Sequence, residues 1–234
     1  MSGDTVCVVP ARAGSKRLPG KNLASLGGKP LIRHTIDAAV ESGVFAEVVV
    51  SSDDDGVLDL ARSLGISADR RPDALATDTA RAVEVVAELL DRRWRSAPRR
   101  VAMMLPTCPL RTADDVRAAV CAFDAEPDVA FLVGVTAFEF PPELALYEVG
   151  GGPRVRMADP GAYRTSTRGQ SWPRAVRPNG SIYLADTVAF LRERTFFVDP
   201  CLVHVMPAER SIDIDFAFQL QMAEALLMQR AEPS

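Results

Sequence analysis

Residues 10–22, PARAGSKRLPGKN, combine small side chains with a dense group of cations and directly follow the apolar run TVCVV. The cations of this loop are Arg12, Lys16, Arg17 and Lys21. Ala13, Gly14 and Ser15 are small enough to let backbone N–H groups approach an anion. The carboxyl end of the first strand of a parallel sheet is also where such sheets bind ligands. The loop is therefore predicted to bind phosphate, with a solvated basic turn as the alternative.

Two familiar phosphate-binding loops do not fit these residues. The P-loop needs Gly, four residues and then Gly-Lys-Ser/Thr. Here Gly14 and Gly20 are separated by five residues, and Asn22 replaces the hydroxyl residue. Pro19 also removes one backbone N–H from such a cradle, and the dinucleotide pattern G-x-G-x-x-G is absent. What remains is a cationic loop in which a planar guanidinium, such as that of Arg12, can hold two phosphate oxygens at once.

A pair of carboxylates in the last part of the sequence adds a second kind of chemistry. In SIDIDFAFQL, Asp213 and Asp215 are two residues apart, so an extended backbone places both on one face. Ile212 and Ile214 then point the opposite way, into the core. Adjacent carboxylates repel each other, and Mg²⁺ prefers hard oxygen ligands together with substrate phosphates. The pair is predicted to bind Mg²⁺, while capping of the next helix by Asp215 is an alternative that can coexist.

Composition limits the class of protein. The 234 residues are 47% hydrophobic and 25% charged, enough for one sizeable core but not for two full domains. The net charge of −4 argues against binding to nucleic acid. No apolar run approaches the roughly 20 residues that span a membrane, and the N-terminal residues lack a secretory pattern. The four cysteines form no C-x-x-C pair and are expected to be buried free thiols, and two histidines exclude a histidine-rich metal site. A soluble, cytoplasmic protein without nucleic-acid or membrane partners is expected.

Strand-like and helix-like patterns alternate along most of the chain. Strands are expected at 5–9, 47–52, 100–106 and 129–135, and helices at 30–43, 56–65, 79–94, 113–124 and 216–230. This alternation predicts an α/β fold with a largely parallel sheet and right-handed crossovers. The last helix is expected to place Phe216, Leu220, Ala223 and Leu227 on one face. The acidic turn SSDDDG at 51–56 is interpreted as a cap for the next helix rather than as a metal site.

The alternation stops near Phe138. Residues 138–178 are rich in Pro, Gly and Arg and show no helical period, which predicts an inserted arm of short strands and loops. Regular structure is expected to return with SIYLAD at residues 181–186. The chain, 1–234, is therefore interpreted as a single domain with one inserted arm.

Residues 10–22, followed by LGGKPLIRHTI at 26–36, resemble the signature of the sugar nucleotidyltransferases. More narrowly, they are similar to the acylneuraminate cytidylyltransferases, which make CMP-activated sialic acids and related nonulosonic acids. The fold that this resemblance implies is a Rossmann-like, mostly parallel sheet of the nucleotidyltransferase (GT-A-like) type. In that family the loop wraps the triphosphate of CTP, which implies that Arg12, Lys16 and Lys21 hold phosphates. The nucleotide-binding residues implied are Ala11, Arg12, Ala13, Gly14, Ser15, Lys16, Lys21, Asn22, Arg71 and Asp78.

Two further blocks extend the resemblance. RRPDALATDTA at 70–80 is similar to the segment in which an arginine before proline recognises cytosine; this role falls on Arg71, with Asp78 ordering the loop. MMLPTCPLR at 103–111 resembles the family's LQPTSPLR, which implies that Pro106 and Thr107 face the substrate. Leu105 stands where the family carries a glutamine that helps to bind the sugar acid.

RGQSWPRAVRPNGSIY at 168–183 is similar to the family's sugar-facing segment. The resemblance implies that Gln170, Asn179 and Tyr183 bind the sugar, while Val176 departs from a common tyrosine. The arm resembles the family's dimerisation segment, which implies a homodimer. Arg164 and Arg168 of the arm are then candidates to meet the acceptor carboxylate across the interface.

The resemblance implies a reaction of CTP with a 2-keto sugar acid that gives a CMP-sugar and pyrophosphate, with Mg²⁺ as cofactor. The catalytic residues implied are Arg12, Lys21, Asp213 and Asp215. Leu105 and Val176 remove two polar groups from the expected sugar pocket. One alternative is therefore a different acceptor, such as an octulosonic acid or another acid of a specialised pathway. A nucleotide-binding paralogue without catalysis is the other alternative, and the intact acidic pair and Lys21 argue against it.

Overall fold

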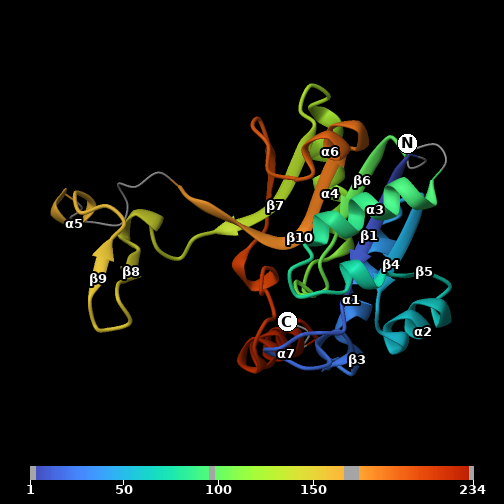
Figure 1. Ribbon diagram of the computed structural model, residues 1–234, viewed down its shortest axis with the longest axis horizontal. Coiled ribbons are helices and arrows are strands. Elements are labelled where there is room, and N and C mark those ends of the chain that lie inside the picture. The colour runs from blue at the N-terminus through green and yellow to red at the C-terminus, as the bar shows by residue number, and fades with distance from the viewer. Residues whose placement is uncertain (1–3, 95–97, 166–173, 232–234) are drawn as a thin grey trace.

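A computed structural model describes residues 4–94, 98–165 and 174–231 of the chain. Within these residues, the main sheet has the strand order β11-β7-β10-β6-β1-β4-β5 (Figure 1). The strands are β1 Thr5–Pro10, β4 Glu47–Ser52, β5 Ser67–Arg70, β6 Arg100–Met103, β7 Phe131–Ala137, β10 Val176–Asp186 and β11 Leu202–Val205. β10 runs antiparallel to β6 and β7, and the other neighbouring pairs are parallel. The predicted α/β class with a mostly parallel sheet is confirmed.

Helices cover both faces of this sheet. They are α1 Leu31–Ser42, α2 Asp55–Ser63, α3 Ala82–Arg93, α4 Ala113–Ala125 and α6 Thr187–Glu193, whereas α7 Ala217–Ala231 packs elsewhere. Buried side chains of α3 and α6 pack with one face, and those of α1, α2 and α4 pack with the other. β1 is a continuous apolar run because both of its faces are buried. Val6 and Val8 pack in the cluster with α3 and α6, and Cys7 and Val9 pack in the cluster with α1, α2 and α4.

The C-terminal helix α7 closes a third apolar cluster at one end of the sheet. Ala223 is buried there beside Leu26 of the short β2–β3 hairpin, which comprises β2 Ser25–Leu26 and β3 Lys29–Pro30. Leu220 and Leu227 pack against this cluster, as predicted. Phe216 was expected on the same face but precedes the helix and is exposed. The reason is that the helix begins one residue later and Phe216 belongs to the segment that enters it.

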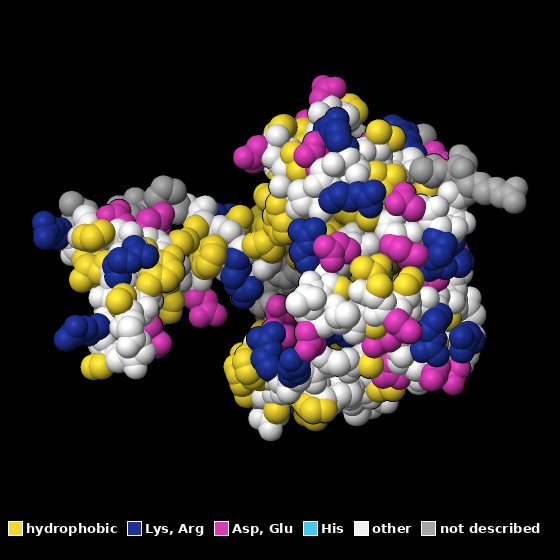
Figure 2. Space-filling model, in the orientation of Figure 1, with side chains coloured by type: hydrophobic (Ala, Val, Ile, Leu, Met, Phe, Trp, Pro, Cys, Tyr) yellow, Lys and Arg dark blue, Asp and Glu magenta, His cyan; other side chains and the backbone are white. Residues whose placement is uncertain are grey.

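The inserted arm projects away from the sheet (Figure 1). Its described part contains η3 Pro142–Leu144, β8 Leu146–Glu148, β9 Val155–Met157 and α5 Ala162–Thr165, so a short helix accompanies the short strands and loops expected here. Figure 2 shows hydrophobic side chains gathered over the arm and its base. The exposed large hydrophobic residues of this region are Phe138, Phe140, Leu146, Tyr147, Val149, Val155, Met157 and Tyr163.

The cysteines are free but differ in exposure. Burial raises the pKa of Cys7 to about 12 and that of Cys108 to about 11. Cys201 is half-buried, and Cys121 is exposed, which corrects the expectation of buried thiols. On α4, Ala119 and Phe123 take the inward positions, so Cys121 falls on the solvent side of the helix. No described helix is long and apolar enough to cross a membrane.

Candidate active site

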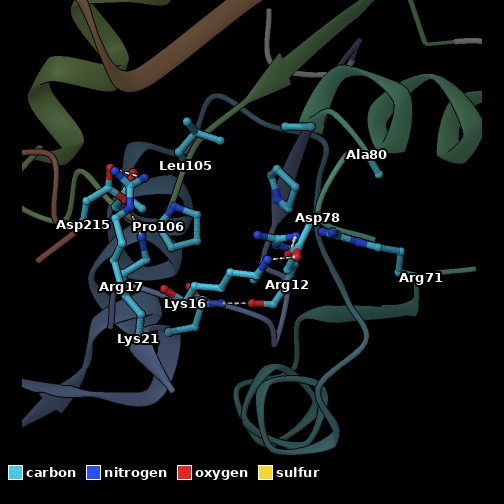
Figure 3. A pocket seen from close by; sticks show the side chains of 16 residues that line it. Arg12, Lys16, Arg17, Lys21, Arg71, Asp78, Ala80, Leu105, Pro106 and Asp215 are labelled. Carbon is cyan, nitrogen blue, oxygen red and sulfur yellow. Dashed lines mark hydrogen bonds and ion pairs between the residues drawn. The ribbon is translucent and has the colours of Figure 1, made fainter. Parts of the chain in front are cut away.

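A cavity of about 530 Å³ opens at the carboxyl ends of β1 and β6, where a parallel sheet places its ligands (Figure 3). Four separate segments meet there: the loop after β1, the segment after β5, the segment after β6 and the segment before α7. Its lining consists of Pro10, Ala11, Arg12, Ser15, Lys16, Arg17, Lys21, Asn22, Arg71, Asp78, Ala80, Ala82, Leu105, Pro106, Thr107 and Asp215. Most of the predicted nucleotide-binding residues are thus brought together, whereas Ala13 and Gly14 are not in this lining.

Hydrogen bonds hold the cationic loop in shape. The Asn22 side-chain amide donates to the Arg12 carbonyl oxygen at 3.0 Å, and Asn22 itself is buried. The Ala13 N–H donates to a carboxylate oxygen of Asp53 at 2.9 Å. The Asp54 side chain caps α2 by accepting hydrogen bonds from the backbone N–H groups of Gly56 and Val57, as predicted for the acidic turn. The loop is therefore hydrogen-bonded to the acidic turn after β4, a contact that could not be predicted from the sequence.

On one side of the pocket, Asp78 bridges two loop cations. Arg12 donates to the Asp78 carboxylate at 2.7 Å and to the Thr77 carbonyl at 2.9 Å, and Lys16 pairs with the other Asp78 oxygen. The hydrogen bond from Lys16, with that from Arg12, holds the pKa of the exposed Asp78 carboxyl below its ordinary value. The predicted ordering role of Asp78 thus has a physical basis, because one carboxylate ties two parts of the loop to the segment after β5.

Arg71 lies deep in the same side of the pocket. Its guanidinium donates to the Ser51 carbonyl at 3.1 Å, and its Nε has no hydrogen-bond partner in the described structure. Burial lowers the pKa of Arg71. Behind it, Asp69 accepts from the Ser51 hydroxyl and from Arg92 of α3 at 2.8 Å. The Arg71 side chain also lines the pocket, where a planar guanidinium is suited to a flat acceptor-bearing ligand.

Asp215 faces the opposite side of the pocket (Figure 3). One of its oxygens pairs with Lys21 Nζ at 3.0 Å and the other with Arg17 at 2.9 Å. The helix-capping alternative falls to Gln219 instead, whose side-chain oxygen accepts from the N–H groups of Asp215 and Phe216.

The segment that carries the acidic pair is anchored through its alternate residues. Ile214 is buried in the third apolar cluster and Ile212 packs against it, as the alternation predicted. The Ile214 N–H donates to the Thr107 carbonyl at 2.7 Å. Asp213 and Asp215, by contrast, are only half-buried. Among the described residues, no group of three or more His, Cys, Asp or Glu gathers as a metal cage.

The predicted sugar-binding residues occupy different surroundings. Leu105, Pro106 and Thr107 line the pocket. Asn179 is buried, where its amide group hydrogen-bonds Ser181 at 2.6 Å and Ser211 at 2.9 Å.

Tyr183 and Val176 also lie behind the lining. Burial raises the pKa of Tyr183 to about 12, and its ring packs against Phe196 and Phe197. Val176 packs against the core rather than lining the pocket. Arg168 and Gln170 lie outside the described residues, and Arg164 is exposed on the arm. Sugar binding by these residues stays a prediction.

Arg111 lies in the site region, and no sequence pattern predicted a role for it. It is buried and donates to the carbonyl oxygens of Leu105 and Gly180, while its Nε and one terminal nitrogen lack partners in the described structure. Burial lowers its pKa. Arg111 thus joins the exit of β6 to the turn in β10, which are the two backbone segments beneath Thr107.

We expect replacement of Asp115 by asparagine to destabilise the support of the acidic segment. Asp115 is buried, caps α4 with Thr112, and receives two hydrogen bonds from Arg210 at 2.7 and 2.9 Å. The carboxylate is buried but Arg210 is half-buried, so breaking the pair should cost about 2 kcal/mol of the free energy of unfolding at pH 7, measurable by urea denaturation. Asp59→Asn, which removes an exposed pair with Arg62, is the control and should cost less than about 0.5 kcal/mol.

The contribution of the Asp115–Arg210 pair to the free energy of unfolding should decrease at low pH. Burial acts to raise the pKa of Asp115, but Arg210 and Thr112 outweigh it and hold that pKa below the ordinary value. The contribution is therefore complete above the unfolded-state pKa of about 4 and disappears as the pH falls through the lower folded-state pKa. A difference between Asp115→Asn and the unsubstituted chain that persists undiminished at pH 2 would contradict this account.

Known proteins match both the sequence and this fold. A cytidylyltransferase family model matches residues 6–97. A pseudaminic acid cytidylyltransferase from Campylobacter jejuni is 33% identical, with 94% of this chain and 95% of that relative covered. A CMP-N,N′-diacetyllegionaminic acid synthase from Legionella pneumophila is 32% identical, with 95% of each chain covered. An N-acylneuraminate cytidylyltransferase from Streptococcus agalactiae is 33% identical over 90% of this chain, which spans half the length of that relative.

Among solved structures, a CMP:2-keto-3-deoxy-manno-octonic acid synthetase in complex with CTP superimposes with a TM-score of 0.71 at 20% identity, covering 97% of this chain and 100% of the other. This likeness shows the fold, a mostly parallel sheet with helices on both faces. The family model and the relatives show that the chain is an enzyme of the nucleotidyltransferase class. Within this class, the chain belongs to the acylneuraminate cytidylyltransferase family.

Proposed function

We propose that the protein transfers the cytidylyl group of CTP to a 2-keto sugar acid of the nonulosonic class, giving a CMP-sugar and pyrophosphate. The observation that carries this proposal is the meeting of Arg71, Lys21 and Asp215 around one pocket. The relatives named for pseudaminic, legionaminic and N-acylneuraminic acid support the acceptor class. Cytoplasmic location is part of the proposal, because free cysteines are typical of a reducing compartment.

Selection of CTP falls to the buried side of the pocket. The guanidinium of Arg71 presents donors, and cytosine offers the acceptors O2 and N3 on one edge. Uracil carries a hydrogen on N3, so a donor facing it would be left unpaired in a buried place. Such an unpaired buried group costs about 1–3 kcal/mol, which favours CTP over UTP.

The loop cations act on the triphosphate. Arg12, Lys16 and Lys21 are placed to hold phosphate oxygens and to stabilise the charge that grows on the leaving pyrophosphate. The anomeric hydroxyl of the acceptor attacks the α-phosphorus in line with the departing pyrophosphate. Little covalent work falls to side chains in such a step, so positioning and charge neutralisation dominate.

Asp213 and Asp215 fit a divalent cation, because both are hard oxygen ligands on alternate positions of the segment before α7. Asp215 lines the pocket and faces the loop that holds the phosphates, whereas Asp213 is not among the lining residues. Mg²⁺, when bound, supplies further neutralisation of phosphate oxygens. The carboxylates would hold it, and the buried Ile214 between them fixes the segment that carries them.

The function is tested by measuring pyrophosphate release from each of the four nucleoside triphosphates with a panel of acids. The panel contains pseudaminic, legionaminic, N-acetylneuraminic and 3-deoxy-manno-octulosonic acids. We expect CTP and a nonulosonic acid to give the highest kcat/KM. Preference for the octulosonic acid would support the alternative acceptor that the apolar Leu105 in the pocket favours. Preference for UTP, or no release with any pair, would contradict the proposal.

We expect Gly134→Ala to impair acceptor binding while leaving CTP binding unchanged. Gly134 of β7 faces the irregular turn of β10, and a Cβ there would collide with the Ser181 hydroxyl and lie 3.1 Å from Asn179 Oδ1. The forced shift should cost about 2 kcal/mol of stability and raise KM for the acid about tenfold at saturating CTP. Gly152→Ala, whose Cβ would meet nothing within 4 Å, is the control. An unchanged KM for the acid would show that the turn of β10 does not contribute to acceptor binding.

We also propose that the arm forms a homodimer, because its apolar residues are exposed in one chain. Light scattering should give twice the mass of the chain. Phe140→Asp, which places a charge at the most exposed of these residues, should dissociate the dimer and lower activity, whereas the same change at exposed Val188 of α6 should not. A fully active monomer would contradict the proposal and remove the acceptor role of Arg164.

A further inference from the structure

Arg17 is the loop cation to which neither the family resemblance nor the proposed reaction gives a role. Its guanidinium lies over the ring of Phe216 at 5.1 Å and pairs with Asp215 at 2.9 Å. Phe216 in turn stacks with Phe218. Arg17 is thereby held at the wall of the pocket that carries the acidic segment, although more than half of its side chain is exposed.

Both oxygens of the Asp215 carboxylate are used in this arrangement. Lys21 takes one oxygen and Arg17 takes the other. A divalent cation approaching this carboxylate would therefore meet two positive charges about 3 Å from its ligand atoms. The free site is electrostatically unfavourable for a metal, even though the carboxylate itself is a suitable ligand.

A triphosphate changes this balance. It brings several negative charges into a pocket whose four loop cations are otherwise paired with Asp78 and Asp215. Phosphate oxygens are strong acceptors for guanidinium groups, and Arg17 lines the same pocket. When Arg17 turns from the carboxylate to the phosphates, one oxygen of Asp215 becomes free for a metal.

We propose that Arg17 is a phosphate-binding residue that couples metal binding to nucleotide binding, by exchanging its partner from the Asp215 carboxylate to the phosphates of the bound nucleotide. This inference rests on the proposed function, since it assigns the order in which the same site is filled. The coupling is reciprocal, so the metal must also strengthen binding of the phosphates.

The test measures two affinities that move in opposite directions. In the nucleotide-free protein, Arg17→Gln should bind Mn²⁺ about tenfold more tightly than the unsubstituted chain, because one competing positive charge is gone. Electron paramagnetic resonance of Mn²⁺ measures this affinity. The same variant should bind inorganic pyrophosphate about tenfold more weakly in metal-free calorimetry. A misfolded or loosened loop would weaken both affinities, so the opposite signs identify the exchange.

Arg33→Gln is the matched control, because Arg33 pairs with Asp37 at 2.5 Å on α1, outside the pocket. It should change neither affinity. Unchanged Mn²⁺ and pyrophosphate binding in Arg17→Gln, with normal turnover of CTP by the unsubstituted chain, would overturn this inference and leave the proposed function standing. Mn²⁺ binding that survives Asp215→Asn would overturn this inference alone, whereas no CTP turnover by the unsubstituted chain would overturn both.

Discussion

Asp215→Asn is expected to lower kcat about a thousandfold while the protein remains folded. The substitution keeps the shape of the side chain but removes the charge that faces Lys21 and Arg17. A neutral amide is a weak ligand for Mg²⁺, so charge that develops on the phosphates in the transition state loses its neutralisation. Pyrophosphate release at saturating CTP and acceptor measures this effect.

Binding of CTP should respond in the opposite sense. In the unsubstituted chain Asp215 competes with phosphate for two cations, and asparagine competes less. Metal-free calorimetry is therefore expected to show CTP affinity that is equal or higher in Asp215→Asn. Loss of affinity together with kcat would indicate that the carboxylate only holds the loop in shape.

Asp37→Asn provides a closely matched control. Asp37 also bridges a lysine and an arginine, Lys29 at 3.0 Å and Arg33 at 2.5 Å, on α1 and outside the pocket. Its replacement should leave kcat and CTP affinity within about twofold, because the pair contributes only to local stability. Near-normal Mg²⁺-dependent turnover by Asp215→Asn would remove Asp215 from the metal site.

The elements with simple periodicity could be predicted from the sequence. β1 is an uninterrupted apolar run because it is buried on both faces, and that pattern needs no knowledge of its neighbours. The alternation of Ile212, Asp213, Ile214 and Asp215 likewise fixes which side chains face the core, whatever the core contains. Local spacing was sufficient in both cases.

Contacts between distant segments could not be predicted in this way. The Asp53 carboxylate was assigned to an acidic cap, yet it holds the Ala13 N–H, because β1 and β4 are neighbours only in the folded sheet. Arg111 ends a recognisable block, but its bonds to Leu105 and Gly180 depend on the antiparallel placement of β10. Asn179 shows the same limit, since its burial and its bond to Ser211 follow from a segment 32 residues away.

Lys21→Ala is expected to lower kcat by about a hundredfold or more and to change the dissociation constant of CTP much less. Lys21 is the least exposed of the four loop cations, with 11% of its side chain accessible. Its ammonium group lies 3.0 Å from a carboxylate oxygen of Asp215. The lysine therefore stands between the phosphate loop and the acidic segment. Charge on the leaving pyrophosphate grows as the bond to the α-phosphorus breaks, so a cation fixed there gains most in the transition state.

Rapid-quench kinetics under single-turnover conditions separates chemistry from CTP binding for this variant. Lys21→Arg should recover part of the rate, because the charge returns with a different reach. Lys29→Ala, which removes the lysine paired with Asp37 outside the pocket, should leave both constants unchanged. A variant with weaker CTP binding but an unchanged rate of chemistry would show that Lys21 anchors the nucleotide equally in the ground state and the transition state, since only interactions that strengthen during reaction raise kcat.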